Sequence, residues 1–141
     1  MENFEIEKDI KVLFVTAKSF PDGIVDALEN IHALVPYSIK RRYFGLSRPE
    51  GNGGIVYKAA AEELNPEEAE LLGCETMIIR KGKYYCITIH DYMKDLSGIG
   101  KAFDELLTQR DLDPDGYCVE WYIDNKDVKC MIRMKSLVTS E

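Results

Sequence analysis

Apolar and β-branched residues recur in short runs along the chain, and polar turns separate these runs. Residues 10–18 form the first such run and predict a strand. Apolar residues at helical spacing then predict a helix over 24–35, which Pro36 ends. Residues 42–47 and 55–61 predict two strands on either side of a glycine-rich connection. The first part of the chain therefore has the predicted order strand, helix, strand, strand.

The same order recurs in the second part of the chain, with one additional strand in front. Apolar residues at helical spacing again predict the helix, and alternating apolar and polar residues predict the strands. The predicted elements are a β-hairpin formed by residues 76–80 and 84–92, a helix over 96–107, and strands over 118–123 and 128–134.

This repetition predicts an internal duplication. Because a repeated unit this small seldom buries its apolar face alone, we expect both copies to pack into one domain, residues 1–141. The first module covers about 10–64, a polar linker covers 65–74, and the second module covers 75–135. The predicted fold is α+β, with one antiparallel sheet and both helices on one face.

The charge balance argues against nucleic acid as a partner. The 141 residues carry a formal net charge of −7, and the only dense basic cluster is Lys40-Arg41-Arg42, which we interpret as a solvated start of a strand. We therefore expect no direct binding of nucleic acid. The chain has no apolar run of the ~20 residues that span a bilayer and no signal-peptide pattern, so we expect a cytoplasmic protein without membrane association.

The cysteines and histidines show no metal-binding pattern. The four cysteines form no C-x-x-C pair, and we interpret them as reduced, buried cysteines that act as small apolar residues. His32 and His90 are far apart in the sequence and have no thiol or carboxylate at ligand spacing, so we expect no metal site. No phosphate-binding loop, dinucleotide fingerprint or G-x-S-x-G motif occurs, and we expect no cofactor.

One carboxylate lies within an apolar, aromatic strand, residues 118–123. Strand alternation places Glu120 on one face with Cys118 and Tyr122. If this carboxylate is buried, it must be hydrogen-bonded, paired or protonated. Among aromatic rings, it suits an organic cation. The alternative is a glutamate that faces water on an edge strand.

Two further groups of residues could line a site. Alternation in residues 84–92 predicts one strand face that carries Tyr84, Cys86, Thr88, His90 and Tyr92. Adjacent strand residues point to opposite faces, so His90 and Asp91 form no acid–base pair there, and cross-strand packing is the favoured interpretation. The other group is an aromatic set in the first module, which forms either core or one wall of a pocket: Tyr37, Tyr43, Phe44 and Tyr57.

These residues also carry a resemblance to a known family. The segments Gly82-Lys83-Tyr84, Ile89-His90-Asp91-Tyr92 and Ile99-Gly100-Lys101-Ala102-Phe103 resemble the hairpin-to-helix region of GyrI-like domains. These domains are also the effector-binding domains of AraC-type and MerR-type transcription activators. Asp115-Gly116 followed by Glu120-Trp121-Tyr122 is similar to the family pattern of an acidic residue two positions before an aromatic one. The resemblance extends from about Lys11 to Lys135.

The resemblance implies two modules that are related by a pseudo-twofold axis, with a ligand cleft between them. It further implies that Glu120 faces this cleft and contacts cationic, aromatic ligands, with Tyr122 on the same strand face. The chain departs from the family at His90-Asp91 and Lys126-Asp127, where family members often have Gly-Pro and a proline. With the aromatic residues above, the predicted ligand-binding set is Glu120, Tyr122, Tyr43, Tyr57 and Tyr92.

The function expected from these observations is a stand-alone small-molecule-binding domain of the regulator type, without its own DNA-binding module. It would act through a protein partner or by sequestering its ligand, and an exposed sheet edge would permit a homodimer. Two alternatives follow from the resemblance. One is a hydrolase of strained cyclopropane-containing toxins, with Glu120 as general base and Tyr122 or Tyr43 orienting the substrate. The other is a protein-interaction module of the gyrase-inhibitor type.

Overall fold

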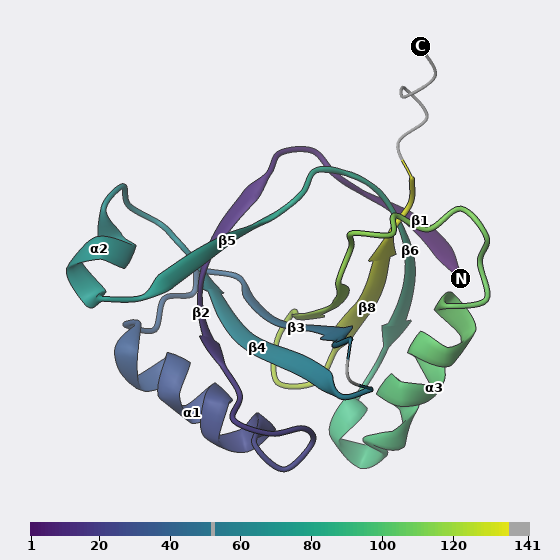
Figure 1. Cartoon of the computed structure of the whole chain (residues 1–141), viewed down its shortest axis with the longest axis horizontal. Coiled ribbons are helices and arrows are strands. Elements are labelled where there is room, and N and C mark those ends of the chain that lie inside the picture. The colour runs from purple at the N-terminus through teal and green to yellow at the C-terminus, as the bar shows by residue number, and fades with distance from the viewer. Residues whose placement is uncertain (52, 136–141) are drawn as a thin grey trace. The chain divides into compact units, whose positions relative to one another are not determined.

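The computed structural model describes residues 1–51 and 53–135, which form an α+β fold with antiparallel strand pairing. Figure 1 shows these elements along the chain. No helix among the described residues is long and apolar enough to cross a membrane. The strands are β1 (Glu2–Ile6), β2 (Ile10–Thr16), β3 (Tyr43–Pro49), β4 (Ile55–Glu62), β5 (Glu75–Ile79), β6 (Gly82–Ile89), β7 (Cys118–Tyr122) and β8 (Val128–Arg133). The helices are α1 (Ile24–Leu34), α2 (Glu68–Leu72), α3 (Ser97–Leu106) and the 3₁₀ turn η1 (Tyr92–Lys94).

Residues 9–79 form one compact unit, which we call the α1 unit. Its strands lie in the order β3-β4-β2-β5, and α1 packs against β2 and β4 (Figure 1). Because alternate residues of a strand share a face, Leu13 of β2 and Tyr57 of β4 both reach the apolar side of α1, where Ile31 is buried. This layer of helix on sheet is the core of the unit.

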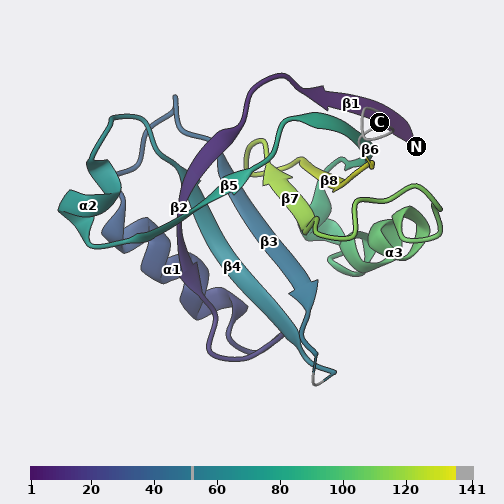
Figure 2. The same cartoon turned by 45° about the horizontal axis from the view of Figure 1, so that its top comes forward.

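Residues 1–8 and 80–135 form the second compact unit, which we call the α3 unit. Its strands lie in the order β1-β6-β8-β7, and α3 packs against β6 and β8 (Figure 2). The buried face of α3 carries Phe103 and Leu106, which contact Cys130 and Ile132 of β8. The sequence predicts a helix over 96–107, and α3 forms the central part of that range. Phe103 and Leu106 are buried, whereas Leu96 and Leu107, at the two ends of the range, lie outside α3 and are exposed.

The two units have the same succession of elements, because β2-α1-β3-β4 corresponds to β6-α3-β7-β8. Each unit gains one more strand, β5 in the α1 unit and β1 in the α3 unit. A pseudo-twofold relation between the modules stays a prediction. The linker region 65–74 contains α2, and Ala69 of α2 is buried in the core of the α1 unit.

The predicted hairpin between residues 76–80 and 84–92 is wrong. β5 pairs with β2, with Ile79 opposite Ile10, whereas β6 pairs with β1, with Gly82 opposite Ile6. The reason is the strand β1, which the sequence reasoning missed and which provides a separate partner for β6. The Lys81-Gly82-Lys83 segment therefore continues into a strand instead of reversing the chain.

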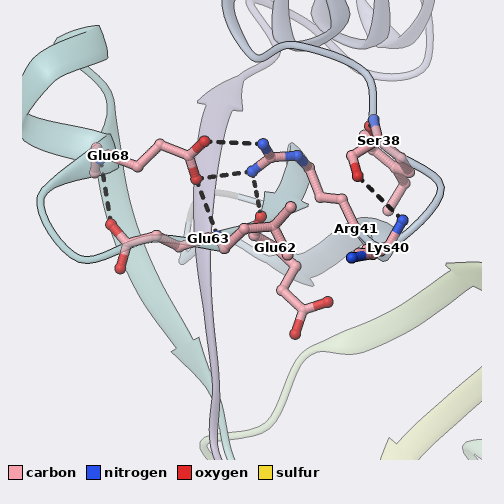
Figure 3. Close-up of polar contacts among 9 residues, drawn as sticks. Ser38, Lys40, Arg41, Glu62, Glu63 and Glu68 are labelled. Carbon is pink, nitrogen blue, oxygen red and sulfur yellow. Dashed lines mark hydrogen bonds and ion pairs between the residues drawn. The ribbon is translucent and has the colours of Figure 1, made fainter.

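The basic cluster Lys40-Arg41-Arg42 is not simply solvated, because Arg41 is buried with 6% of its surface exposed. Its guanidinium donates two hydrogen bonds to the Glu68 carboxylate, at 2.9 and 2.8 Å, and one to the Glu62 carbonyl at 2.6 Å (Figure 3). Arg42 forms a second bidentate pair with the Glu62 carboxylate, at 3.0 and 2.7 Å. A fully buried arginine needs such partners, so this cluster fastens α2 to the start of β3.

Candidate functional site

The predicted anionic residue Glu120 lies in the middle of β7, opposite Cys130 of β8. Its neighbours on the same face, Cys118 and Tyr122, pack against the core beneath α3. Glu120 itself is half-buried. The expectation of an edge-strand glutamate that simply faces water therefore does not describe this side chain.

The Glu120 carboxylate has one side-chain partner within its own strand. The Tyr122 hydroxyl donates a short hydrogen bond to Glu120 Oε1. Residues two apart on a strand project from the same face, so the strand geometry itself brings these groups together. A hydroxyl donor stabilises the charged carboxylate, which has the capacity to accept further hydrogen bonds.

A second tyrosine joins this pair from a different part of the sequence. The Tyr92 ring lies 5.8 Å from the Tyr122 ring, with the planes inclined by 51°. Tyr92 N donates to the Lys126 carbonyl at 2.8 Å, and Asp91 N donates to Asp127 Oδ1 at 3.2 Å. These bonds anchor the segment after β6 to the turn between β7 and β8. Glu120, Tyr122 and Tyr92, three of the five predicted site residues, thus form one cluster, which we call the Glu120 cluster.

The protonation of the Glu120 cluster is shifted by burial. Loss of hydration raises the pKa of Glu120, and the hydrogen bond from Tyr122 offsets part of that rise. Burial also raises the pKa of Tyr92, and the charges of Asp124 and Glu120 raise it further. A partly buried carboxylate with a raised pKa is destabilised as an anion, and a cation placed beside it would relieve that cost.

The thiol opposite Glu120 is held in its neutral form. Cys130 is fully buried, and burial raises its pKa to about 12, with a further contribution from the negative charge of Glu120. A thiol is nucleophilic only as the thiolate, so Cys130 is not a nucleophile. It is a buried, apolar neighbour of Glu120. All four cysteines are free, as the sequence predicts, but only Cys86 and Cys130 are buried. The prediction of burial is wrong for Cys74 and Cys118, which are partly exposed.

The predicted strand face with Tyr84, Cys86, Thr88, His90 and Tyr92 is partly wrong, because β6 ends at Ile89. Asp91 has φ = 56°, in the left-handed region, and this reverses the chain so that Tyr92 packs with the core beneath α3. His90 does not use Asp91. Its Nδ1 lies 3.2 Å from Asp127 Oδ2, and the imidazole is 78% exposed, so this pair is a surface contact.

Tyr43 and Tyr57, the other two predicted site residues, belong to the α1 unit. Tyr57 is buried in the core of that unit and has 1% of its surface exposed. Tyr43 is half-buried, with its ring 5.0 Å from that of His32 and stacked 6.1 Å from that of Tyr37. Their place in a ligand site stays a prediction.

Two features of the Glu120 cluster were missed by the sequence reasoning. Cys130 as the cross-strand neighbour of Glu120 could have been found by pairing the two strands around the turn at 124–127. The role of that turn could not, because Asp124 Oδ1 accepts from Lys126 N and Asp127 N, and this local geometry presents the Lys126 carbonyl to Tyr92.

The sequence matches no family model, and it matches none of the curated proteins. Solved structures share the fold. An integron cassette protein from the mobile metagenome of Vibrio cholerae has a TM-score of 0.70 and 14% identity, with 95% of each chain covered. A proposed bacterial transcription regulation protein from Staphylococcus aureus MU50 has a TM-score of 0.58 and 9% identity, covering 94% of this chain and 97% of that one.

Two further structures with the same fold differ in their described properties. SAV2435, bound to tetraphenylphosphonium, has a TM-score of 0.56 and 11% identity, covering 94% of this chain and 93% of that one. A hydrolase from Listeria innocua has a TM-score of 0.57 and 9% identity, covering 95% of this chain and 90% of that one. At such low identity the likeness shows the fold alone, because one fold supports different functions.

Proposed function

We propose that this protein binds hydrophobic cationic small molecules, with Glu120 as the anionic anchor and Tyr122 and Tyr92 as aromatic contacts. The observation that carries the proposal is the half-buried Glu120 carboxylate, which has a tyrosine hydroxyl as its side-chain partner and a second tyrosine ring nearby. Burial disfavours the carboxylate anion, so the anion gains more from a cationic ligand than a solvated carboxylate does. The aromatic faces add attraction for the same ligand class.

The comparisons support this class of ligand without identifying it. Tetraphenylphosphonium, which is bound to one protein of the same fold, is a large apolar cation. Such an ion carries a delocalised charge and little hydration, so it loses little on leaving water. By analogy with the regulator of the same fold and with GyrI-like domains, we propose that binding serves to sense or sequester the ligand.

The test is isothermal titration with tetraphenylphosphonium and, as a neutral aromatic control, triphenylphosphine oxide. Wild-type protein is expected to bind the cation and to discriminate against the neutral compound. Glu120→Gln keeps the shape of the side chain and removes its charge, and we expect it to weaken cation binding about tenfold or more. Glu105→Gln, an exposed position on α3, makes the same charge change and should leave binding unaltered. Equal binding by wild type and Glu120→Gln would refute the anchoring role.

A second candidate function is hydrolysis of an electrophilic, strained ring. The observations that favour it are a carboxylate whose pKa is raised, as a general base requires, and a hydrolase of the same fold. In this reaction Glu120 would take a proton from water while the water oxygen bonds to a ring carbon. The ring C–C bond of that carbon would break with its electron pair going to the departing carbon, which would then take up the proton held by Glu120. Mass spectrometry of a cyclopropane-containing electrophile incubated with wild type and with Glu120→Gln distinguishes turnover from binding alone.

A further inference from the structure

The strand β5 ends the sheet of the α1 unit and has a sequence suited to pairing with itself. β5 pairs with β2 along one side only, and no hydrogen bond joins the backbone of residues 75–79 to any other described residue. An edge with free backbone donors and acceptors is a template for another strand. β5 follows α2 along the chain (Figure 2) and is the last strand in the order β3-β4-β2-β5.

The charges along β5 are arranged with opposite signs at its two ends. Glu75 begins the strand, and Arg80 and Lys81 follow its last residue, Ile79. If two copies pair antiparallel about Met77, Glu75 of one copy lies opposite the partner's Ile79. It is then a diagonal neighbour of the partner's Lys81, with Arg80 between, within the roughly 7–8 Å that long side chains cross. Because a twofold axis relates the copies, this favourable contact occurs twice.

The outer residues of the same segment are apolar and exposed. Ile78 has 45% of its surface exposed, and Leu71, at the end of α2 just before β5, has 84% exposed. In the self-paired register, Thr76 of one copy faces the partner's Ile78, so pairing would cover apolar surface as well as backbone groups.

The other terminal strand, β1, has a charge pattern that is less suited to self-pairing than that of β5. β1 is the last strand of the α3 unit, and its sequence is Glu2-Asn3-Phe4-Glu5-Ile6. Antiparallel self-pairing about Phe4 would make Glu5 a diagonal neighbour of the partner's Glu5. No basic residue within the strand would compensate. Like charges at neighbouring positions disfavour such pairing, so self-pairing is less favourable for β1 than for β5.

We propose that β5 is a homodimer interface, in which two copies of this chain extend their sheets by antiparallel pairing of residues 75–79. The proposal is independent of the function of the Glu120 cluster. The interface is short, so the dimer is expected to form reversibly and to depend on concentration and on salt.

The experiment is sedimentation velocity of the full chain over a hundredfold range of concentration, with charge-swap variants. Glu75→Lys alone, and Arg80→Glu with Lys81→Glu, each place like charges together twice, and each should weaken the dimer about tenfold or more. An equimolar mixture of the two variants restores both attractive contacts and should dimerise. The chain that carries all three substitutions should also recover the homodimer. Glu5→Lys on β1 is the matched control and should have no effect.

Three results would overturn the proposal. Wild-type protein could remain monomeric over the whole range. It could form a dimer that none of the β5 variants weakens. Or the mixed variants could stay monomeric although each alone is folded, as far-UV circular dichroism and thermal unfolding verify. The recovery in the triple variant separates a lost interface from a misfolded chain.

Discussion

The Tyr122 hydroxyl donates a hydrogen bond to the carboxylate of Glu120, two residues earlier on β7. This bond stabilises the ionised carboxylate in a setting where burial opposes ionisation. If the cluster binds a cation as proposed, this bond favours the ionised form of Glu120 that would attract it. It also makes the two residues separable by mutation, because the hydroxyl can be removed while the ring stays.

Tyr122→Phe is expected to raise the pKa of Glu120 further, because the variant loses a donor to the charged form and keeps the same burial. The loss of one hydrogen bond should lower the free energy of unfolding by about 1 kcal/mol. Carbon-13 NMR titration of the glutamate side chains measures the pKa. If the Glu120 titration is identical in the variant and wild type, the hydrogen bond has no influence on the carboxylate.

Glu120→Gln is expected to change the pH dependence of stability. A carboxyl whose pKa is raised in the folded state contributes stability that is fully present below its unfolded pKa of about 4.5 and is lost as the pH rises through the folded value. The glutamine variant cannot ionise, so its stability relative to wild type should improve from pH 4 to pH 8. Urea unfolding across this range measures the trend, with Glu105→Gln as the control. A difference in free energy of unfolding between Glu120→Gln and wild type that stays the same from pH 4 to pH 8 would contradict this prediction.

Glu68→Gln should strongly destabilise the α1 unit. Arg41 holds the pKa of Glu68 at about 2, well below the usual 4.5, through two hydrogen bonds. This lowering of the pKa corresponds to a contribution of about 3 kcal/mol to the free energy of unfolding. The contribution is present above pH 4.5 and is lost as the pH falls through about 2. The variant leaves the buried Arg41 guanidinium without its anion, so a loss of about 3 kcal/mol is expected near neutral pH.

Denaturant unfolding of Glu68→Gln, Arg41→Met and the double variant provides a thermodynamic cycle for this pair. The double variant should be less destabilised than the sum of the single variants, because it leaves no buried charge alone. Additive losses would show that the two side chains stabilise the fold independently.

The sequence predicts α1, α3 and the strands from β2 to β8 because their signals are local: a helical apolar stripe, strand alternation, and turn residues between them. It assigns the region of α2 to a polar linker and the start of η1 to a strand. β1 could not be predicted in this way, because Glu2-Asn3-Phe4-Glu5-Ile6 has only two apolar residues and is held as a strand by pairing with β6. The position of Tyr92 could not be predicted from local sequence either. It depends on the left-handed conformation of Asp91 and on a hydrogen bond to the distant Lys126.

For the candidate site, alternation alone places Glu120 and Tyr122 on one face, and this was predicted. Arg41 shows the limit of such reasoning. A basic tripeptide is solvated in most proteins, and only the tertiary position of Glu68, 27 residues later, explains why this arginine is buried.

The four cysteines should fall into two classes of reactivity. Cys86 and Cys130 are fully buried, and burial raises the pKa of both, to about 12 for Cys130, so their thiolate fraction near pH 8 is very small. Cys74 and Cys118 are half-buried and therefore accessible to a reagent. Iodoacetamide labelling followed by peptide mass mapping should modify Cys74 and Cys118 first. Unfolding in guanidinium should make all four react at similar rates, and early modification of Cys130 in the folded protein would show that the core beside Glu120 opens to solvent.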